Sequence, residues 1–200
     1  MMVKICGITN REDAQAAADA GATAIGFNFY RGSSRYIQPR QAAEISAAVN
    51  LTKVGVFVNE SPAEIERIVQ LAGLDVIQLH GDESPQAANQ HTGRVWKAFR
   101  VTESWTAGIL DSYTAEAFLL DAPSNGSYGG SGTAFDWKRA NGIQRNIILA
   151  GGLDATNVGA AIQAVLPWGV DSCSRLEISP GRKDHDKMRR FIEAALTESI

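Results

Sequence analysis

Short apolar runs alternate with longer amphipathic stretches along the whole chain. Such runs are typical of strands. Two of them, Val54–Val58 and Ile147–Ala150, are almost continuously apolar, which is typical of strands covered on both faces in a parallel sheet. The predicted strands are Val3–Cys6, Ala24–Phe29, Lys53–Val58, Val76–His80, Val95–Arg100, Ala117–Asp121, Asn146–Ala150 and Gly169–Ser172.

A candidate helix follows each predicted strand. Apolar residues recur at helical spacing most clearly from Ile65 to Ala72. The segments Thr9–Glu12 and Ser61–Glu64 fit the capping box, in which a hydroxyl and a Glu three residues later satisfy free N–H groups. Three prolines fit the first turns of predicted helices, where the missing N–H costs nothing: Pro39, Pro62 and Pro85.

Eight strand–helix units with buried strands predict a single (β/α)8 barrel, a TIM barrel, over residues 1–200. The alternative is an open doubly wound sheet, which uses fewer strands and commonly carries a G-x-G-x-x-G turn after the first. Here the first strand is followed by Gly7-Ile8-Thr9, and no Walker A sequence occurs. The loose stretch from Pro123 to Gly132 is interpreted as a long loop rather than a domain linker.

Composition restricts the class of protein and its partners. The 200 residues are 44% hydrophobic and 20% charged, with a net charge of -3, which argues against a broad nucleic-acid surface. Two cysteines argue against a disulfide framework and suit a reducing compartment. The N-terminus shows no signal-peptide pattern, and no run is long enough to span a membrane. We expect a cytoplasmic protein without nucleic-acid or membrane partners, either a monomer or a homodimer.

The carboxyl ends of barrel strands form the face where active sites lie. A rim of purely structural residues would carry mainly Gly, Ser and Asn, whereas this rim also carries groups capable of chemistry. We expect His80 and Arg100 to contact a substrate there, although His80 could instead hydrogen-bond loop carbonyls. The predicted rim consists of Cys6, Asn28, Asn59, His80, Arg100, Asp121, Gly151-Gly152 and Ser172-Cys173-Ser174.

Cys6 is the first candidate for chemistry. Side chains alternate along a strand, so Lys4 and Cys6 share one face while Val3 and Ile5 share the other. An ammonium group beside a thiol favours the thiolate, which is the reactive form. The alternative is a buried cysteine that acts only as a small hydrophobe.

Asp121 is the second candidate, because it closes the apolar run that begins at Phe118. Burial at the mouth of a barrel disfavours the charged carboxylate, which suits a general acid. The alternative roles are a helix cap and a partner for a nearby arginine.

Three segments have the character of phosphate sites, because glycine lets backbone N–H groups approach an anion closely. They follow the sixth, seventh and eighth strands, and barrels frequently bind phosphate after strands seven and eight. Arg35, in the loop after the second strand, could hold a carboxylate through two parallel hydrogen bonds, or could be an ordinary surface arginine. The predicted phosphate residues are Gly130, Gly132, Gly151, Gly152, Ser174 and Arg175.

A metal site is not predicted. His80 with Asp82 and Glu83 could serve a divalent ion, but the other histidines, His91 and His185, fall in distant helices. A Ser-His-Asp triad is also unsupported, because the chain has no Gly-x-Ser-x-Gly elbow.

Taken together, these segments resemble the phosphoribosylanthranilate isomerase family of tryptophan biosynthesis. The resemblance spans essentially the whole chain. It rests on Lys4–Asn10, Gly26–Phe29, Ser33–Ile37, Val54–Asn59, Ile77–Glu83, Leu119–Asp121, Gly130–Trp137, Leu149–Leu153 and Pro180–Asp184.

The resemblance implies an Amadori rearrangement of a phosphorylated aminoaldose, a small-molecule phosphosugar, into an aminoketose without cofactor or metal. The family's general base matches Cys6, its general acid matches Asp121, and its contact to the anthranilate carboxylate matches Arg35.

One segment, Asp171–Glu177, departs from the family's usual Asp-Val-Ser-Ser-Gly-Val-Glu pattern. Arg175 replaces a glycine, and its side chain either pairs with the phosphate or turns outward to an acidic neighbour. Cys173 would lie near Cys6 because the first and eighth strands of a barrel are neighbours. A disulfide is possible if their Cα atoms come within about 7 Å.

Two other functions stay open on the sequence alone. One is a metal-using sugar-phosphate epimerase with His80 and Asp82 as ligands. The other is a catalytically silent barrel that binds a phosphometabolite through Gly151, Gly152 and Ser174.

Overall fold

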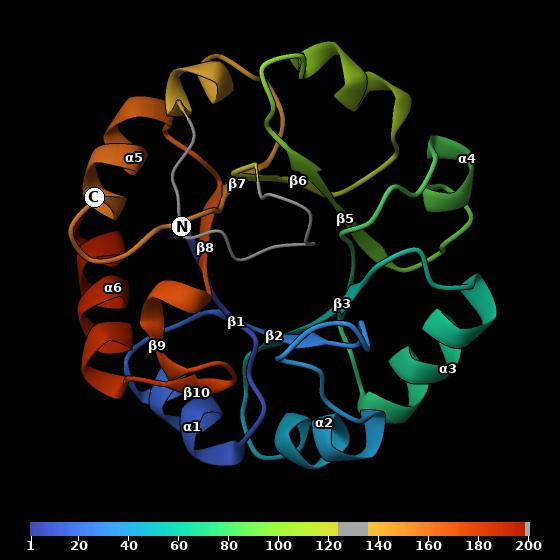
Figure 1. The fold of residues 1–200 in the computed structure, drawn as a ribbon, viewed down its shortest axis with the longest axis vertical. Coiled ribbons are helices and arrows are strands. Elements are labelled where there is room, and N and C mark those ends of the chain that lie inside the picture. Colours follow the sequence, from blue (N-terminus) through green and yellow to red (C-terminus); the bar gives the residue numbers. More distant parts are fainter. Residues whose placement is uncertain (124–135, 199–200) are drawn as a thin grey trace.

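The computed structural model describes residues 1–123 and 136–198. Eight parallel strands close into a barrel in chain order, with β1 paired to both β2 and β8, as Figure 1 shows. The predicted (β/α)8 barrel is therefore confirmed, and most predicted strand bounds are right to within one residue. The strands are β1 (Met2–Cys6), β2 (Ala24–Asn28), β3 (Thr52–Phe57), β4 (Val76–Leu79), β5 (Arg94–Arg100), β6 (Ala117–Asp121), β7 (Ile147–Leu149) and β8 (Gly169–Ser172).

Helices surround the barrel (Figure 1). The α-helices are α1 (Arg11–Asp19), α2 (Pro39–Ser46), α3 (Pro62–Ala72), α4 (Pro85–Ala88), α5 (Val158–Val165) and α6 (His185–Thr197). Short 3-10 helices are η1 (Ala107–Ser112), η2 (Trp137–Ala140) and η3 (Ser174–Leu176), and a hairpin of β9 (Glu177–Ser179) and β10 (Arg182–Lys183) follows β8. The helices described after β5 and β6 are thus 3-10 turns, the form that short segments commonly take.

The helix starts confirm part of the capping prediction. Pro39, Pro62 and Pro85 occupy the first turns of α2, α3 and α4. Ser61 caps α3 by accepting from the Glu64 N–H, but its own N–H donates to Glu60, so the reciprocal half of the box is not formed there. The box at Thr9 is wrong, because Asn10 caps α1 by accepting from the Asp13 N–H.

Apolar side chains form two layers of core. One fills the barrel interior, and a larger one packs between the strands and the helices. Val3 and Ile5 belong to the outer layer, whereas Lys4 and Cys6 share the opposite face of β1, as predicted. Gly26 on β2 makes room for them, since a Cβ there would lie 2.8 Å from Cys6 Sγ and 3.0 Å from Lys4 Cε.

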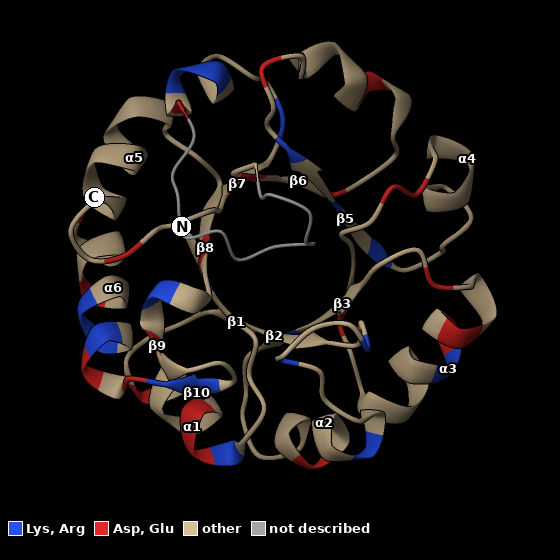
Figure 2. Cartoon of the chain, in the orientation of Figure 1, with Lys and Arg blue, Asp and Glu red and all other residues tan. Residues whose placement is uncertain are grey.

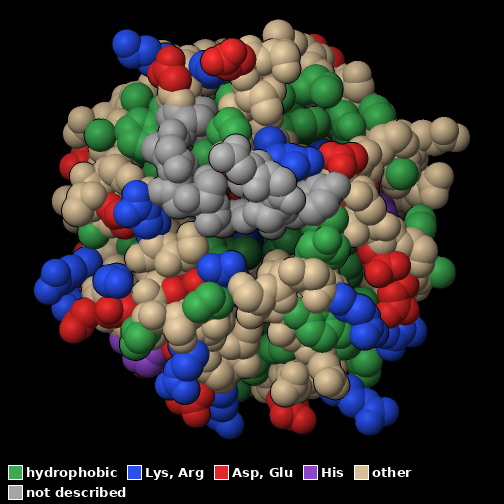
Figure 3. Space-filling model, in the orientation of Figure 1, with side chains coloured by type: hydrophobic (Ala, Val, Ile, Leu, Met, Phe, Trp, Pro, Cys, Tyr) green, Lys and Arg blue, Asp and Glu red, His purple; other side chains and the backbone are tan. Residues whose placement is uncertain are grey.

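Charged residues of both signs are distributed over the outer helices and the loops (Figure 2), and both signs are interspersed around the face shown in Figure 3. No helix in the described residues combines the length and apolar character needed to cross a membrane.

Candidate active site

A hollow of about 700 Å³, including its open mouth, lies at the carboxyl ends of the strands. The structure brings most of the predicted site residues together in its lining. They are Cys6, Arg35, His80, Asp121, Gly151, Gly152, Ser174 and Arg175.

Three predicted residues are not placed in that lining. Arg100 ends β5, pairs with Asp82 at 2.8 Å and lines a neighbouring pocket that shares His80 with the first. Gly130 and Gly132 lie outside the described residues.

Beneath Cys6, the fully buried Lys4 forms an ion pair with Asp171, with 2.9 Å between Nζ and Oδ1. The β1–β8 register sets the two residues side by side. Although burial alone would lower it, the pKa of Lys4 is raised by the charges of Asp171 and Cys6. A permanent ammonium group therefore lies within the electrostatic reach of the sulfur.

Cys6 and Cys173 form a second pair across the same two strands. The register pairs Ile5 with Ser172, so it brings the two cysteines into adjacent positions. A hydrogen bond with Cys173 lowers the pKa of Cys6 well below its ordinary value; burial acts in the opposite direction, and the charges of Lys4 and Lys183 add to the lowering. The same hydrogen bond, with burial, raises the pKa of Cys173. The arrangement favours a thiolate on Cys6 and a thiol on Cys173.

The sequence predicted the influence of Lys4 and the proximity of Cys173, but not that the hydrogen bond with Cys173 would have the largest effect on the pKa of Cys6. Cys6 ends β1 and Cys173 directly follows β8, so a disulfide between them stays a prediction. Both cysteines are free and only partly buried.

Asp121 reaches the hollow from the end of β6, with its side chain 11% exposed. Oδ1 accepts the Ala122 N–H at 2.8 Å, and Oδ2 lies 3.4 Å from His80 Nε2. The other ring nitrogen of His80 lies 2.9 Å from Gln78 Nε2. Arg100 is the register neighbour of Asp121 on β5, and its described ion pair is with Asp82. The backbone at Gly151 can lie close to the Asp121 carboxylate only because it carries no side chain, since a Cβ there would lie 2.8 Å from Asp121 Oδ1.

The loops after β7 and β8 meet where the phosphate site is predicted. Gly151 and Gly152 both have positive φ, 82° and 64°, a conformation that glycine adopts without strain. Ser172 Oγ donates to the Leu153 carbonyl at 2.6 Å and links the two loops. Arg175 is half exposed, and its Nη1 lies 3.9 Å from Asp154 Oδ2, so an acidic neighbour is the partner described for it.

Arg35 and the hairpin after β8 form a charged cluster that sequence reasoning did not assemble. Arg35 donates through Nε and Nη2 to Glu177, which also accepts from Lys183. The only sequence signal was the segment Pro180–Asp184, to which no role was assigned.

The described residues contain no group of three His, Cys, Asp or Glu side chains placed to hold a metal ion. The ligands considered for such an ion have protein partners, since His80 meets Gln78 and Asp121 while Asp82 pairs with Arg100.

Comparison with known proteins identifies the family. The model for N-(5'-phosphoribosyl)anthranilate (PRA) isomerase matches residues 3–194. The N-(5'-phosphoribosyl)anthranilate isomerase of Solibacter usitatus is 52% identical over 197 residues, covering 98% of this chain and 97% of the relative.

Solved structures of isomerases from the same family superpose on this chain. The phosphoribosyl anthranilate isomerase of Thermus thermophilus superposes with a TM-score of 0.90 at 37% identity, covering 98% of this chain and 99% of the other. Monomers generated from the dimeric Thermotoga maritima isomerase superpose with a TM-score of 0.84 at 36% identity and the same coverage. The chain therefore belongs to the N-(5'-phosphoribosyl)anthranilate isomerase family.

Proposed function

We propose that this protein is a phosphoribosylanthranilate isomerase of tryptophan biosynthesis. It would convert N-(5-phosphoribosyl)anthranilate into 1-(2-carboxyphenylamino)-1-deoxyribulose 5-phosphate. The observation that carries the assignment is one hollow lined by both Cys6, from β1, and Asp121, from β6. Family membership names the reaction, and these two groups supply the proton transfers that it needs.

Asp121 is the proposed general acid. Its proton goes to the ring oxygen while the bond from C1′ to that oxygen breaks and the anilino nitrogen forms a Schiff base with C1′. The Schiff base acidifies the C2′ proton, which the thiolate of Cys6 removes, and the resulting enolamine tautomerises to the ketone. A positioned proton-transfer group is typically worth about a hundred- to ten-thousand-fold in rate.

The remaining residues hold the two ends of the substrate. The glycines Gly151 and Gly152, with Ser174 and Arg175, would bind the phosphate, and Gly130 and Gly132 are proposed to contribute from outside the described residues. Arg35 would bind the anthranilate carboxylate, while His80 and Arg100 would contact the substrate between or beside these anchors. Binding energy at both ends then fixes the reacting carbons between acid and base.

An isomerase assay on the purified protein tests the proposal. NMR should show loss of the C1′ aldose signal and appearance of a C2′ ketone carbon, with the rate unchanged by a chelator. Loss of turnover on chelation would instead support the metal-dependent epimerase. Tight binding of the phosphosugar without any turnover would support the silent binding barrel.

A further inference from the structure

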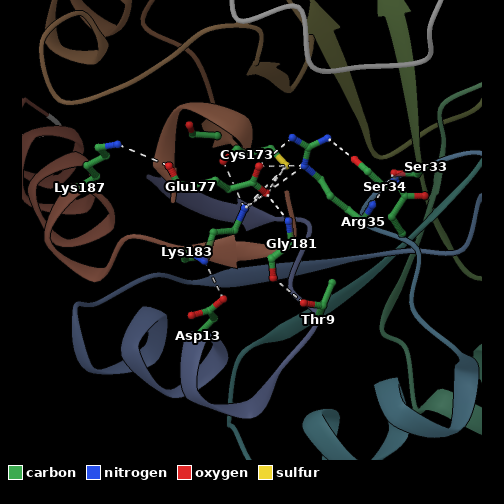
Figure 4. Close-up of polar contacts among 12 residues, drawn as sticks. Thr9, Asp13, Ser33, Ser34, Arg35, Cys173, Glu177, Gly181, Lys183 and Lys187 are labelled. Atoms are coloured by element: carbon green, nitrogen blue, oxygen red, sulfur yellow. Dashed lines mark hydrogen bonds and ion pairs between the residues drawn. The ribbon is translucent and has the colours of Figure 1, made fainter. Parts of the chain in front are cut away.

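Glu177 lies behind the predicted carboxylate contact and does not line the hollow itself. It opens β9, and its side chain is only 4% exposed, while that of Arg35 is 18% exposed. Figure 4 shows Arg35, Glu177 and Lys183 converging from separate segments of the chain.

Glu177 grips one edge of the Arg35 guanidinium. Nε lies 2.9 Å from Oε1 and 3.1 Å from Oε2, and Nη2 lies 2.7 Å from Oε2. An arginine side chain has five N–H donors in a planar fork. This grip uses the Nε side of the fork and leaves the end formed by Nη1 and Nη2 for another planar anion.

The other end of the fork is weakly engaged. Within residues 1–123 and 136–198, Nη1 donates only to Ser34 Oγ, at a long 3.4 Å. Because Arg35 lines the hollow, a substrate carboxylate can approach that end while Glu177 keeps its own hydrogen bonds. Glu177 is thus a support for such a contact and not a competitor.

The charges in this cluster also favour an anion. Lys183, which is 3% exposed, donates to Glu177 Oε1 at 3.0 Å. Burial would raise the pKa of Glu177, but its hydrogen bond to Arg35 and its contacts with Lys183 lower it, so the carboxylate is charged. Within the Arg35–Glu177–Lys183 cluster, two cations face one carboxylate, so the guanidinium charge is not fully matched by Glu177.

The hairpin that carries Glu177 and Lys183 is fixed at several points. Gly181, with φ of 81°, makes the turn; its N–H donates to Glu177 Oε1 and its carbonyl accepts from Thr9. The Lys183 N–H donates to Asp13 of α1 at 2.8 Å. The grip on Arg35 is therefore rigid, as precise positioning requires.

We infer that Glu177, supported by Lys183 on the β9–β10 hairpin, is a positioning residue that aims Arg35 at the carboxylate of the substrate. This rests on the proposed function and adds a determinant of substrate specificity to it. The role is to favour aminoaldoses that bear an aromatic acid over those that lack one.

The test compares two substrates, N-(5-phosphoribosyl)anthranilate and its aniline analogue without the carboxylate. The wild-type protein should prefer the first in kcat/KM by at least about tenfold, the usual scale for hydrogen bonds between charged groups. Glu177→Gln should raise KM for the first substrate by about tenfold and change kcat and the analogue's kinetics little. Glu116→Gln is the matched control, because it alters another arginine–carboxylate pair, with Arg94 on β5, outside the hollow.

A second variant and a turnover-independent signal guard against misfolding. Glu177→Asp keeps the charge but shortens the reach, and should lose part of the preference. In arginine-labelled wild-type protein, the Arg35 Nε–H resonance should exchange slowly with solvent, and quickly in Glu177→Gln.

The outcomes separate the two proposals. Equal losses on both substrates, unchanged kinetics or a fast-exchanging wild-type Nε–H would overturn the inference alone. A wild-type protein inactive on both substrates would overturn the proposed function, and the inference with it.

Discussion

Two buried ion pairs on opposite sides of the barrel have the same length and nearly the same burial, yet their surroundings differ. Lys4–Asp171 and Lys97–Glu83 both measure 2.9 Å, and all four side chains are at most 8% exposed. Lys4 lies beneath the sulfur of Cys6, and its pKa is raised. Lys97 also donates to the backbone carbonyls of Leu79, Gly81 and Ala98, and burial lowers its pKa in spite of Glu83.

The difference shows that a buried charge acquires its role from its other neighbours. Lys97 holds the loop after β4, where Glu83 accepts from the Asn59 and Gly81 N–H groups, so this pair stabilises the rim. The next neighbour of Lys4 is the thiol of Cys6, so the Lys4 ammonium instead helps to lower the pKa of that thiol.

Replacement of Cys6, the thiol beside the Lys4–Asp171 pair, should have the largest effect on kcat. Cys6→Ala should lower kcat by about a hundred- to ten-thousand-fold, because the proposed base is absent. Steady-state kinetics with a thermal unfolding curve would check this. Near-normal kcat in a folded variant would remove Cys6 from the mechanism.

Asp121→Asn should cause a loss of the same order, since an amide cannot deliver the proton to the ring oxygen. The hydrogen bond from the Ala122 N–H can be kept by the amide oxygen, so the fold should survive. The kinetics should show a fall in kcat with little change in KM. A fall confined to KM would instead make Asp121 a binding residue.

Oxidation should reversibly remove the same base. Peroxide would convert the Cys6 thiolate into a sulfenic acid, and attack by the Cys173 sulfur would form the disulfide with loss of water. We expect a mass decrease of about 2 Da with loss of activity, both reversed by a thiol reductant. Cys173→Ser should form no disulfide, and an unchanged mass in the oxidised wild-type protein would contradict the prediction.

The sequence was sufficient for the barrel but not for the cluster around Cys6. Strand positions follow from local apolar runs, and Lys4 and Cys6 share a face because of strand alternation alone. The hydrogen bond with Cys173 depends on the register at barrel closure, between residues 167 positions apart. Barrel closure predicted that Cys173 would lie near Cys6, but not that the two would be hydrogen-bonded. The contact between Glu177 and Arg35 depends in addition on a hairpin turn, so local patterns could not predict it.

Errors of the local analysis have similar causes. Thr9 and Asn10 are both capping residues, and only the path of the chain decides that Asn10 caps α1. His80 was weighed as a metal ligand because two carboxylates follow it in the sequence, but the side chains that contact it, Gln78 and Asp121, come from β4 and β6. The ends of different strands bring together side chains that lie far apart in the sequence, so spacing along the chain cannot predict which of them make contact.

The comparison of the two lysines predicts a difference in pH dependence. The lowered pKa of Cys6 means that kcat/KM should fall only when the pH drops well below the ordinary thiol range. Lys4→Met removes a nearby cation, so this acidic limb should move to higher pH by about one unit. Lys97→Met should leave the limb in place.

Both variants should lose stability to a similar extent, about 3–5 kcal/mol, because each leaves a buried carboxylate unpaired. Denaturant unfolding and pH–rate profiles of the two variants form a matched pair of measurements. An acidic limb that moves equally in both would show that loosening of the fold, and not the charge of Lys4, is responsible.

Arg175→Gly should have the smallest effect. Its long, half-exposed contact with Asp154 is of the kind that contributes about 0–1 kcal/mol, so the loss of this contact should hardly change stability. With the phosphate held mainly by the backbone of Gly151 and Gly152, KM should rise less than about fivefold at unchanged kcat. A larger rise in KM would show that the Arg175 side chain, and not the backbone of Gly151 and Gly152, contributes most of the phosphate binding.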